Sequence, residues 1–262
     1  MPLIDRWRDV LDENMRAVWP HLAAAIRGTG GRLMGGTAVA MHLRHRTSDD
    51  LDVMTLKPFP ARSVANSLRS AFPDSYEESE VALNTVDVRV NAVQVQVFRA
   101  LPQESDPEDM TWLMTGPVMD GMSVGSLPDL FATKLDVIMY RPKLRDYIDI
   151  AALDRASGYR IEDGLTLWAR RFGRRIQSRA ADRIVNLLED PEHLPPDRDF
   201  GDVQAETLGY LNERAGEVRR ALGNLRRGHA PDTDGPELHP KRTHGGMIRE
   251  PHRPKPPGRH LT

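Results

Sequence analysis

The sequence contains no cysteine, which excludes disulfide bonds and thiolate-bound metal sites and fits a reducing compartment. It also lacks any apolar run long enough to span a bilayer, and 28% of its residues are charged. Residues 1–15 carry acidic side chains and no apolar segment, so we expect no secretory signal, no membrane contact and a cytoplasmic location. The formal net charge is only −2, so any contact with nucleic acid must depend on local basic patches.

The chain has 262 residues, enough for one sizeable hydrophobic core and two subdomains. Apolar residues at helical spacing near the start of the chain predict one long helix. The same kind of spacing recurs further along the chain, so the expected helices cover residues 3–27, 61–72, 161–172, 176–188 and 200–227. Residues 101–120 show no clear period, and we expect a loop around a short helix there.

Residues 31–55 carry the strongest functional pattern of the chain and read as strand, glycine turn, short helix, loop and strand. Residues 35–37 (Gly-Gly-Thr) stand where the helix begins, and the free N–H groups at a helix start favour phosphate. The second strand opens with Asp50-Leu51-Asp52, and residues i and i+2 of a strand point to the same face. Two carboxylates held close together are what a Mg²⁺ ion bridging nucleotide phosphates requires.

In this order and spacing, these residues resemble the AbiEii/AbiGii-type nucleotidyltransferase toxins of the polymerase-β-like superfamily. The residues that carry the resemblance are Gly35, Gly36, Thr37, Arg46, Ser48, Asp50 and Asp52. The resemblance implies an α/β (α+β) fold, in which a polymerase-β-like nucleotidyltransferase core with a small mixed sheet is followed by a helical C-terminal region. The resemblance covers about residues 30–155. Together with the helical spacing and composition of the rest, it leads us to expect a core with an N-terminal helix (1–125), a helical region that completes the active site (126–227) and a tail (228–262).

Residues 86–98 predict a β-hairpin, because two alternating apolar and polar segments flank Asn91-Ala92. Polymerase-β-like enzymes commonly place a third metal-binding carboxylate on such a strand, but the candidate positions here hold Gln94 and Gln96. Glutamine is a poorer Mg²⁺ ligand than a carboxylate. The AbiEii-like branch often lacks this acid, so the departure leaves open which group activates the attacking hydroxyl.

Lys134 lies inside an apolar helical stripe that begins after Ser126, a residue suited to cap the helix. A lysine in such a stripe is costly unless its ammonium group meets a partner or its stem reaches solvent at the stripe's edge. Family members have a lysine at this place that faces the nucleotide phosphates, and the resemblance implies the same role for Lys134.

The next helix carries Asp146 and Asp149, which lie three residues apart and therefore share a face. Arg141, Lys143 and Arg145 surround them, a pattern that is by itself typical of a surface ion-pair cluster. In the family, an R-x-x-x-x-D-x-x-D segment supplies an essential aspartate, and the resemblance carries that role to Asp149 first and to Asp146 second. Arg145 and Lys143 are candidates for holding the triphosphate or an RNA backbone.

Two segments in the C-terminal part of the chain have unusual compositions: the first is rich in arginine, and the second is poor in apolar residues. The arginines of the first are Arg170, Arg171, Arg174, Arg175 and Arg179. This density is typical of a solvated face, and the alternative is contact with the phosphate backbone of an RNA acceptor. Residues 228–262 combine several prolines with almost no large apolar side chains, so we expect them to be disordered.

The resemblance implies transfer of a nucleoside monophosphate from an NTP to a hydroxyl group. It implies that Asp50 and Asp52 hold Mg²⁺ (or Mn²⁺), with Lys134 among the catalytic residues. The residues expected to contact the nucleotide are Gly35, Gly36, Thr37, Arg46, Ser48 and Arg145. For Asp149 three roles stay open: orienting Lys134, accepting a proton from the attacking hydroxyl, or binding metal.

In studied relatives the acceptor is tRNA, extended at its 3′ end, and the toxin is paired with an antitoxin encoded beside it. The resemblance therefore implies NTP, tRNA and a cognate antitoxin as partners. Three alternatives stay open: a small-molecule nucleotidyltransferase of the antibiotic-resistance type, a protein-modifying nucleotidyltransferase, and a catalytically inert binding module of the same fold. Gln94 and Gln96 favour the inert module, whereas the intact Asp50, Asp52, Lys134 and Asp149 argue against it.

Overall fold

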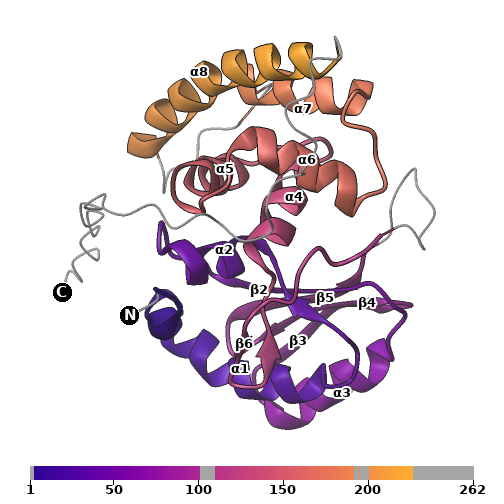
Figure 1. Cartoon of the computed structure of the whole chain (residues 1–262). Helices are drawn as coiled ribbons and strands as arrows, with labels where there is room; N and C mark the ends of the chain where they lie inside the picture. Colours follow the sequence, from indigo (N-terminus) through magenta and orange to yellow (C-terminus); the bar gives the residue numbers. More distant parts are fainter. Residues whose placement is uncertain (1–2, 101–109, 192–193, 195–200, 227–262) are drawn as a thin grey trace, which may run out of the picture.

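The computed structural model of the chain describes residues 3–100, 110–191, 194 and 201–226. A five-stranded mixed sheet lies beside helices α1 (Glu13–Ala25) and α3 (Ala61–Ala71), and the helices from α4 (Leu127–Val137) to α8 (Gly201–Arg226) stack on the opposite side (Figure 1). This arrangement confirms the expected α/β class, with a small mixed sheet followed by a helical region. None of the described helices has the length and apolar character that crossing a bilayer requires. The predicted tail and most of the linker before α8 lie outside the described residues.

The sheet has the strand order β1-β2-β5-β4-β3, and β2 and β5 are its parallel pair. Its strands are β1 (Arg32–Leu33), β2 (Asp50–Thr55), β3 (Tyr76–Ala82), β4 (Thr85–Val90) and β5 (Val93–Arg99). The predicted hairpin is confirmed as β4 and β5, with Asn91 and Ala92 at positive φ in the turn. The edge strand β3, which the sequence did not predict, carries mostly exposed side chains.

Alternation along the central strands separates an apolar face from a polar face. Leu51, Val53, Val95 and Val97 are completely buried on the face next to α1 (Glu13–Ala25) and α3 (Ala61–Ala71). The intervening residues of β2 and β5 are less buried and point the other way. The sheet therefore presents one polar face to the helices that follow it in sequence.

The N-terminal segment forms two helices where the spacing predicted one. A 3₁₀ helix, η1 (Leu3–Val10), precedes α1, and Asp12 caps α1 by accepting a hydrogen bond from the Met15 N–H at 2.7 Å. The apolar spacing continues across the break, so it does not reveal the cap that starts a new helix. Trp7 and Trp19 pack against each other with ring centroids 4.6 Å apart, which confirms the interpretation that they belong to the core.

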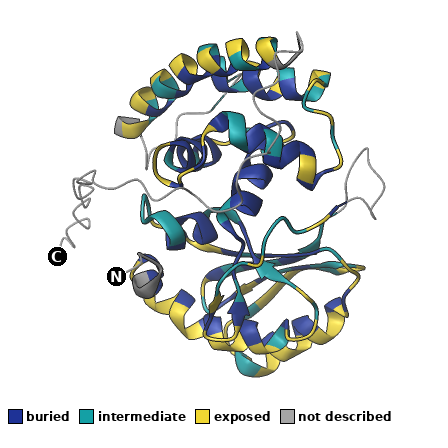
Figure 2. Ribbon diagram, in the orientation of Figure 1, coloured by how far each residue is buried: buried dark blue, intermediate teal, exposed yellow. Residues whose placement is uncertain are grey.

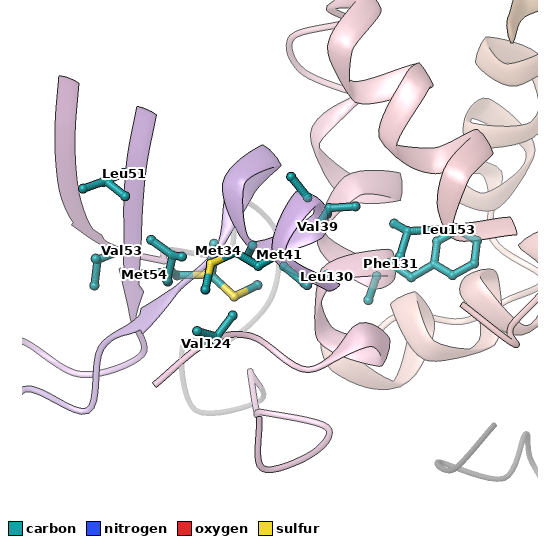
Figure 3. Close-up of a cluster of buried hydrophobic side chains, with 14 of the residues drawn as sticks. Met34, Val39, Met41, Leu51, Val53, Met54, Val124, Leu130, Phe131 and Leu153 are labelled. Atoms are coloured by element: carbon teal, nitrogen blue, oxygen red, sulfur yellow. The ribbon is translucent and has the colours of Figure 1, made fainter. Parts of the chain in front are cut away.

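Helix α2 (Gly35–Leu43) links β1 to β2 and joins the sheet to the helical layer. Figure 3 shows Met34 and Met41 between the side chains of β2 and Leu130 on α4. All three side chains are almost completely buried, and the apolar layer continues to Phe131. The sheet and the helices therefore share one hydrophobic core.

The helical layer comprises α4 (Leu127–Val137), α5 (Leu144–Ala156), α6 (Ile161–Arg171), α7 (Arg179–Glu189) and α8 (Gly201–Arg226). Ser126 caps α4 as predicted, by accepting a hydrogen bond from the Asp129 N–H. Buried positions concentrate where α4, α5 and α6 meet, and the outer face of α8 is exposed (Figure 2). Tyr210 and Arg214 fasten α8 to the buried carboxylate of Asp154 on α5.

The irregular segment 101–120 is only partly described, whereas one expectation for the basic segment was wrong. Residues 110–120 contain no helix and include β6 (Val118–Met119), which pairs with β7 (Met122–Ser123); residues 101–109 lie outside the described residues, so the short helix stays a prediction. Arg171 is not on a solvated or RNA-binding face, because it is fully buried and paired with Asp129 at the start of α4. Its guanidinium also stacks on Trp112, 4.5 Å from the ring centroid. By contrast, Arg170 and Arg175 are exposed.

Candidate active site

Strand β2 holds Asp50 and Asp52 on the polar face of the sheet, while Leu51 is buried on the other face. Two contacts fix the start of this strand against α2. The Thr37 hydroxyl donates to the Asp50 carbonyl oxygen, and the Met34 N–H donates to the Asp52 carbonyl oxygen at 2.7 Å. The Thr37 side chain is therefore engaged by the strand backbone, which sets the position of the two carboxylates.

The two glycines at the start of α2 leave room for charged side chains of the site. Gly35 has φ +67°, and a Cβ added to it would overlap the Asp52 carboxylate. A Cβ added to Gly36 would overlap the Arg46 guanidinium. The two glycines therefore allow the backbone at the start of α2 to lie close to the side chains of Asp52 and Arg46.

Lys134 reaches this site from α4 and is buried between two carboxylates of α5. Its Nζ lies 2.7 Å from Asp146 Oδ1 and 2.7 Å from Asp149 Oδ2. Burial lowers the pKa of an ammonium group, but Asp149 and Asp146 outweigh it and raise the pKa of Lys134 above its ordinary value. Of the two possibilities left open by the sequence, the structure has the one in which the ammonium group of Lys134 meets partners.

Asp149 is completely buried and surrounded by donors. Besides Lys134, it accepts from Arg46 Nε at 2.7 Å, Arg46 Nη2 at 3.0 Å and His45 Nε2 at 2.6 Å. Burial alone raises the pKa of a carboxyl, yet Lys134 and Arg46 hold the pKa of Asp149 far below its ordinary value. Asp149 therefore remains ionised and fixes the positions of Lys134 and Arg46. Its contact with His45 was not predicted from the sequence.

Asp146 differs from Asp149 because half of its carboxylate is unused. Its Oδ1 binds Lys134, but its buried Oδ2 has no hydrogen-bond partner among the residues that the structure describes. Buried acceptors are almost always satisfied, so an orphan of this kind marks a place for a ligand, a cation or a hydroxyl.

An open cavity of about 640 Å³ lies between the polar sheet face and the start of α5. Its lining residues are Gly36, Arg46, Ser48, Asp50, Asp52, Gln94, Gln96, Lys134, Arg141, Lys143, Leu144, Arg145 and Asp146. The structure thus brings most of the predicted site residues together from segments a hundred residues apart. Gly35, Thr37 and Asp149 stand behind this lining and hold its members in place.

The two walls of the cavity carry opposite charge. Asp50 and Asp52 lie on the sheet side, and Arg141, Lys143 and Arg145 lie on the helix side, where the carboxylate of Asp146 is paired with Lys134. Burial and the neighbouring Asp50 raise the pKa of Asp52 to about 6, although Lys134 and Arg141 oppose this.

These residues suit a divalent cation, although the described residues contain no cluster of three or more histidine or acidic side chains arranged for one. Two neighbouring carboxylates that repel each other are relieved by a bound cation, and hard oxygen donors suit Mg²⁺ or Mn²⁺. Asp50 and Asp52 would hold such an ion, and Gln94 and Gln96 lie beside them on β5.

A mixed sheet that sets paired strand carboxylates opposite a buried lysine and basic side chains is an arrangement suited to an enzyme that acts on phosphate groups. The family comparison makes this specific. Residues 32–224 match the family described as "Nucleotidyl transferase AbiEii toxin, Type IV TA system". The chain belongs to this family: it is a nucleotidyltransferase and the toxin of a type IV toxin–antitoxin system, which implies a cognate antitoxin.

Among solved structures, the chain is similar to a provisionally assigned nucleotidyltransferase from H. pylori. The two share 17% sequence identity and a TM-score of 0.46, over 82% of this chain and 99% of the other. No curated protein matches the chain.

Proposed function

We propose that the protein moves a nucleoside monophosphate from an NTP to the 3′ end of tRNA in the cytoplasm, with Mg²⁺ (or Mn²⁺) bound by Asp50 and Asp52. The observation that carries the proposal is the opposition of carboxylate and cationic walls in one cavity. The carboxylates suit the metal ion, and the cations suit the polyphosphate, so a metal–NTP complex complements both walls.

When bound, the metal ion supplies charge neutralisation at the α-phosphate and at the leaving pyrophosphate. Lys134, held between Asp146 and Asp149, offers a fixed ammonium group to the triphosphate. Ser48 and the N-terminus of α2 at Gly36 line the same cavity and are suited to the outer phosphates.

For Asp149 the geometry favours one of the three roles considered. Its oxygens are already occupied by His45, Lys134 and Arg46, and its pKa is far too low for a proton acceptor at neutral pH. We assign Asp149 as a positioning residue that orients Arg46 and Lys134 toward the nucleotide.

Asp146 is the better candidate for the proton acceptor, because the residue lines the cavity and its buried Oδ2 accepts no hydrogen bond from the described residues. In the proposed step, the acceptor hydroxyl oxygen forms a bond to the α-phosphorus and the bond from that phosphorus to the β-phosphate oxygen breaks. Pyrophosphate leaves, and the hydroxyl proton passes to the carboxylate of Asp146.

The choice of tRNA rests on the family resemblance and is compatible with the rim of the cavity. Arg141 and Lys143 are exposed or only partly buried there, next to the place where the acceptor hydroxyl would enter. A phosphate backbone beside that hydroxyl would meet positive charge.

A transfer assay tests the proposal. Purified protein, Mg²⁺ and bulk tRNA are incubated with each α-labelled NTP in turn, using Asp50→Ala as the inactive variant. The matched control is Asp74→Ala, because Asp74 is an exposed carboxylate near β3 and away from the cavity. We expect label in tRNA that Asp50→Ala and EDTA abolish and Asp74→Ala preserves.

Acceptor controls make the test specific. Periodate oxidation destroys the 3′-terminal diol of tRNA, so oxidised tRNA should receive no label if transfer is to the 3′ end. Label that appears only on protein or on a small molecule would replace tRNA as the acceptor. Label on none of these acceptors would overturn the proposed activity.

A further inference from the structure

The polar face of the sheet places two amides directly beside the paired carboxylates. In the parallel register of β2 and β5, Asp50 is opposite Gln94 and Asp52 is opposite Gln96. On the other side of β5, the antiparallel register places Asp87 of β4 opposite Gln96. Asp87, Gln96 and Asp52 therefore form one row across three strands.

Asp87 binds the nitrogen end of both amides. Gln96 Nε2 donates to Asp87 Oδ2 at 2.8 Å, and Gln94 Nε2 donates to Asp87 Oδ1. Each carboxylate oxygen thus serves one glutamine. Both glutamines line the cavity, whereas Asp87 does not.

This network determines which end of each amide faces the cavity. A carboxylate only accepts hydrogen bonds, so the NH₂ end of each glutamine must turn toward Asp87. The carbonyl oxygen of an amide points away from its nitrogen, and β5 lies between β4 and β2. The two carbonyl oxygens therefore turn toward β2, which carries Asp50 and Asp52.

We propose that Asp87 is a positioning residue that presents the amide oxygens of Gln94 and Gln96 to the cation held by Asp50 and Asp52. The site then surrounds its cation with oxygen ligands while adding no third negative charge beside the incoming triphosphate. This inference rests on the proposed function, because it concerns the same metal site.

Mn²⁺ binding to the nucleotide-free protein tests this role without requiring catalysis. Free Mn²⁺ is counted by its electron paramagnetic resonance signal, and thermal unfolding reports whether each variant is folded. Removing a residue that orients metal ligands typically weakens metal binding by at least about tenfold. We therefore expect Asp87→Asn to raise the Mn²⁺ dissociation constant by about this factor.

Two further variants separate positioning from a general structural effect. The double variant Asp87→Asn/Gln96→Glu moves the carboxylate from β4 to β5, where the new amide at position 87 donates to it. It should bind Mn²⁺ at least as tightly as the wild type. Glu77→Gln, a change on the exposed edge strand β3, is the matched control and should leave binding unchanged.

The outcomes distinguish this inference from the proposed function. Unchanged Mn²⁺ affinity in Asp87→Asn, or no recovery in the double variant, overturns the role of Asp87 while Asp50→Ala still abolishes binding. If the wild type binds no Mn²⁺ that depends on Asp50, the proposed metal site fails, and the role of Asp87 fails with it.

Discussion

Replacing Asp149 by asparagine is expected to destabilise the folded protein by about 3–5 kcal/mol, the usual cost of leaving a buried ion pair half removed. Asp149 is completely buried and balances the charges of Lys134 and Arg46 through contacts of 2.7 Å each. Asparagine keeps one acceptor but adds an NH₂ donor that faces these cations. Lys134 retains Asp146, whereas the buried Arg46 loses its carboxylate partner.

Urea-induced unfolding followed by circular dichroism at pH 7 measures this loss. For a domain of this size, each kcal/mol changes the melting temperature by about 2–4 °C, so thermal scans should agree. Asp146→Asn is the matched control, because among the described residues the Asp146 carboxylate forms an ion pair with Lys134 alone, and its loss should cost about 1–3 kcal/mol. A loss below about 1 kcal/mol in Asp149→Asn, or equal losses in both variants, would refute the reasoning.

The pH dependence gives the same prediction a second readout. The folded-state pKa of Asp149 is lowered, so its stabilisation is present above the unfolded-state pKa of about 3.9 and is lost as the pH falls further. The free energy of unfolding of the wild type should therefore decrease on acidification below about pH 4. In Asp149→Asn this decrease should be smaller.

Further predictions concern Asp52 on β2, Gly36 at the start of α2 and the buried Arg171. The pKa of Asp52 is raised to about 6 in the folded protein, so the wild type loses stability as the pH rises from about 4 through 6. In urea unfolding with EDTA present, Asp52→Asn should therefore be more stable than the wild type by about 1–3 kcal/mol at pH 8, and no more stable at pH 4. Gly36→Ala should cost about 1–3 kcal/mol and reduce nucleotide transfer, because its Cβ displaces the Arg46 guanidinium; thermal scans and the transfer assay should change together. Arg171→Met should lower the free energy of unfolding by about 3–5 kcal/mol in urea, whereas Arg175→Ala should change it by less than about 0.5 kcal/mol.

The sequence predicted the parts of the site that depend on local spacing. The two carboxylates of β2, the cap at Ser126 and the need of Lys134 for a partner were all inferred from neighbouring residues, and the structure has them. Asp146 and Asp149 share a face as expected, because both contact the same lysine. Local spacing could not separate their roles, which depend on donors from the loop after α2.

The features that the sequence did not reveal depend on contacts between distant segments. His45 reaches Asp149 across more than a hundred residues, and Arg171 meets Asp129 between two helices. Asp87 was visible in the hairpin, but only the strand order shows that it lies behind Gln94 and Gln96. The strand β3 was missed because its charged and exposed side chains do not alternate with apolar ones.

The candidate site draws its two strand carboxylates from one part of the chain and its lysine and remaining acids from residues that are translated much later. A nascent chain that has emerged only as far as α3 contains Asp50 and Asp52, yet Lys134, Asp146 and Asp149 have not been synthesised. The proposed site therefore cannot assemble until the chain has been synthesised through α5, so an incomplete chain lacks the lysine and the two aspartates of the helical layer.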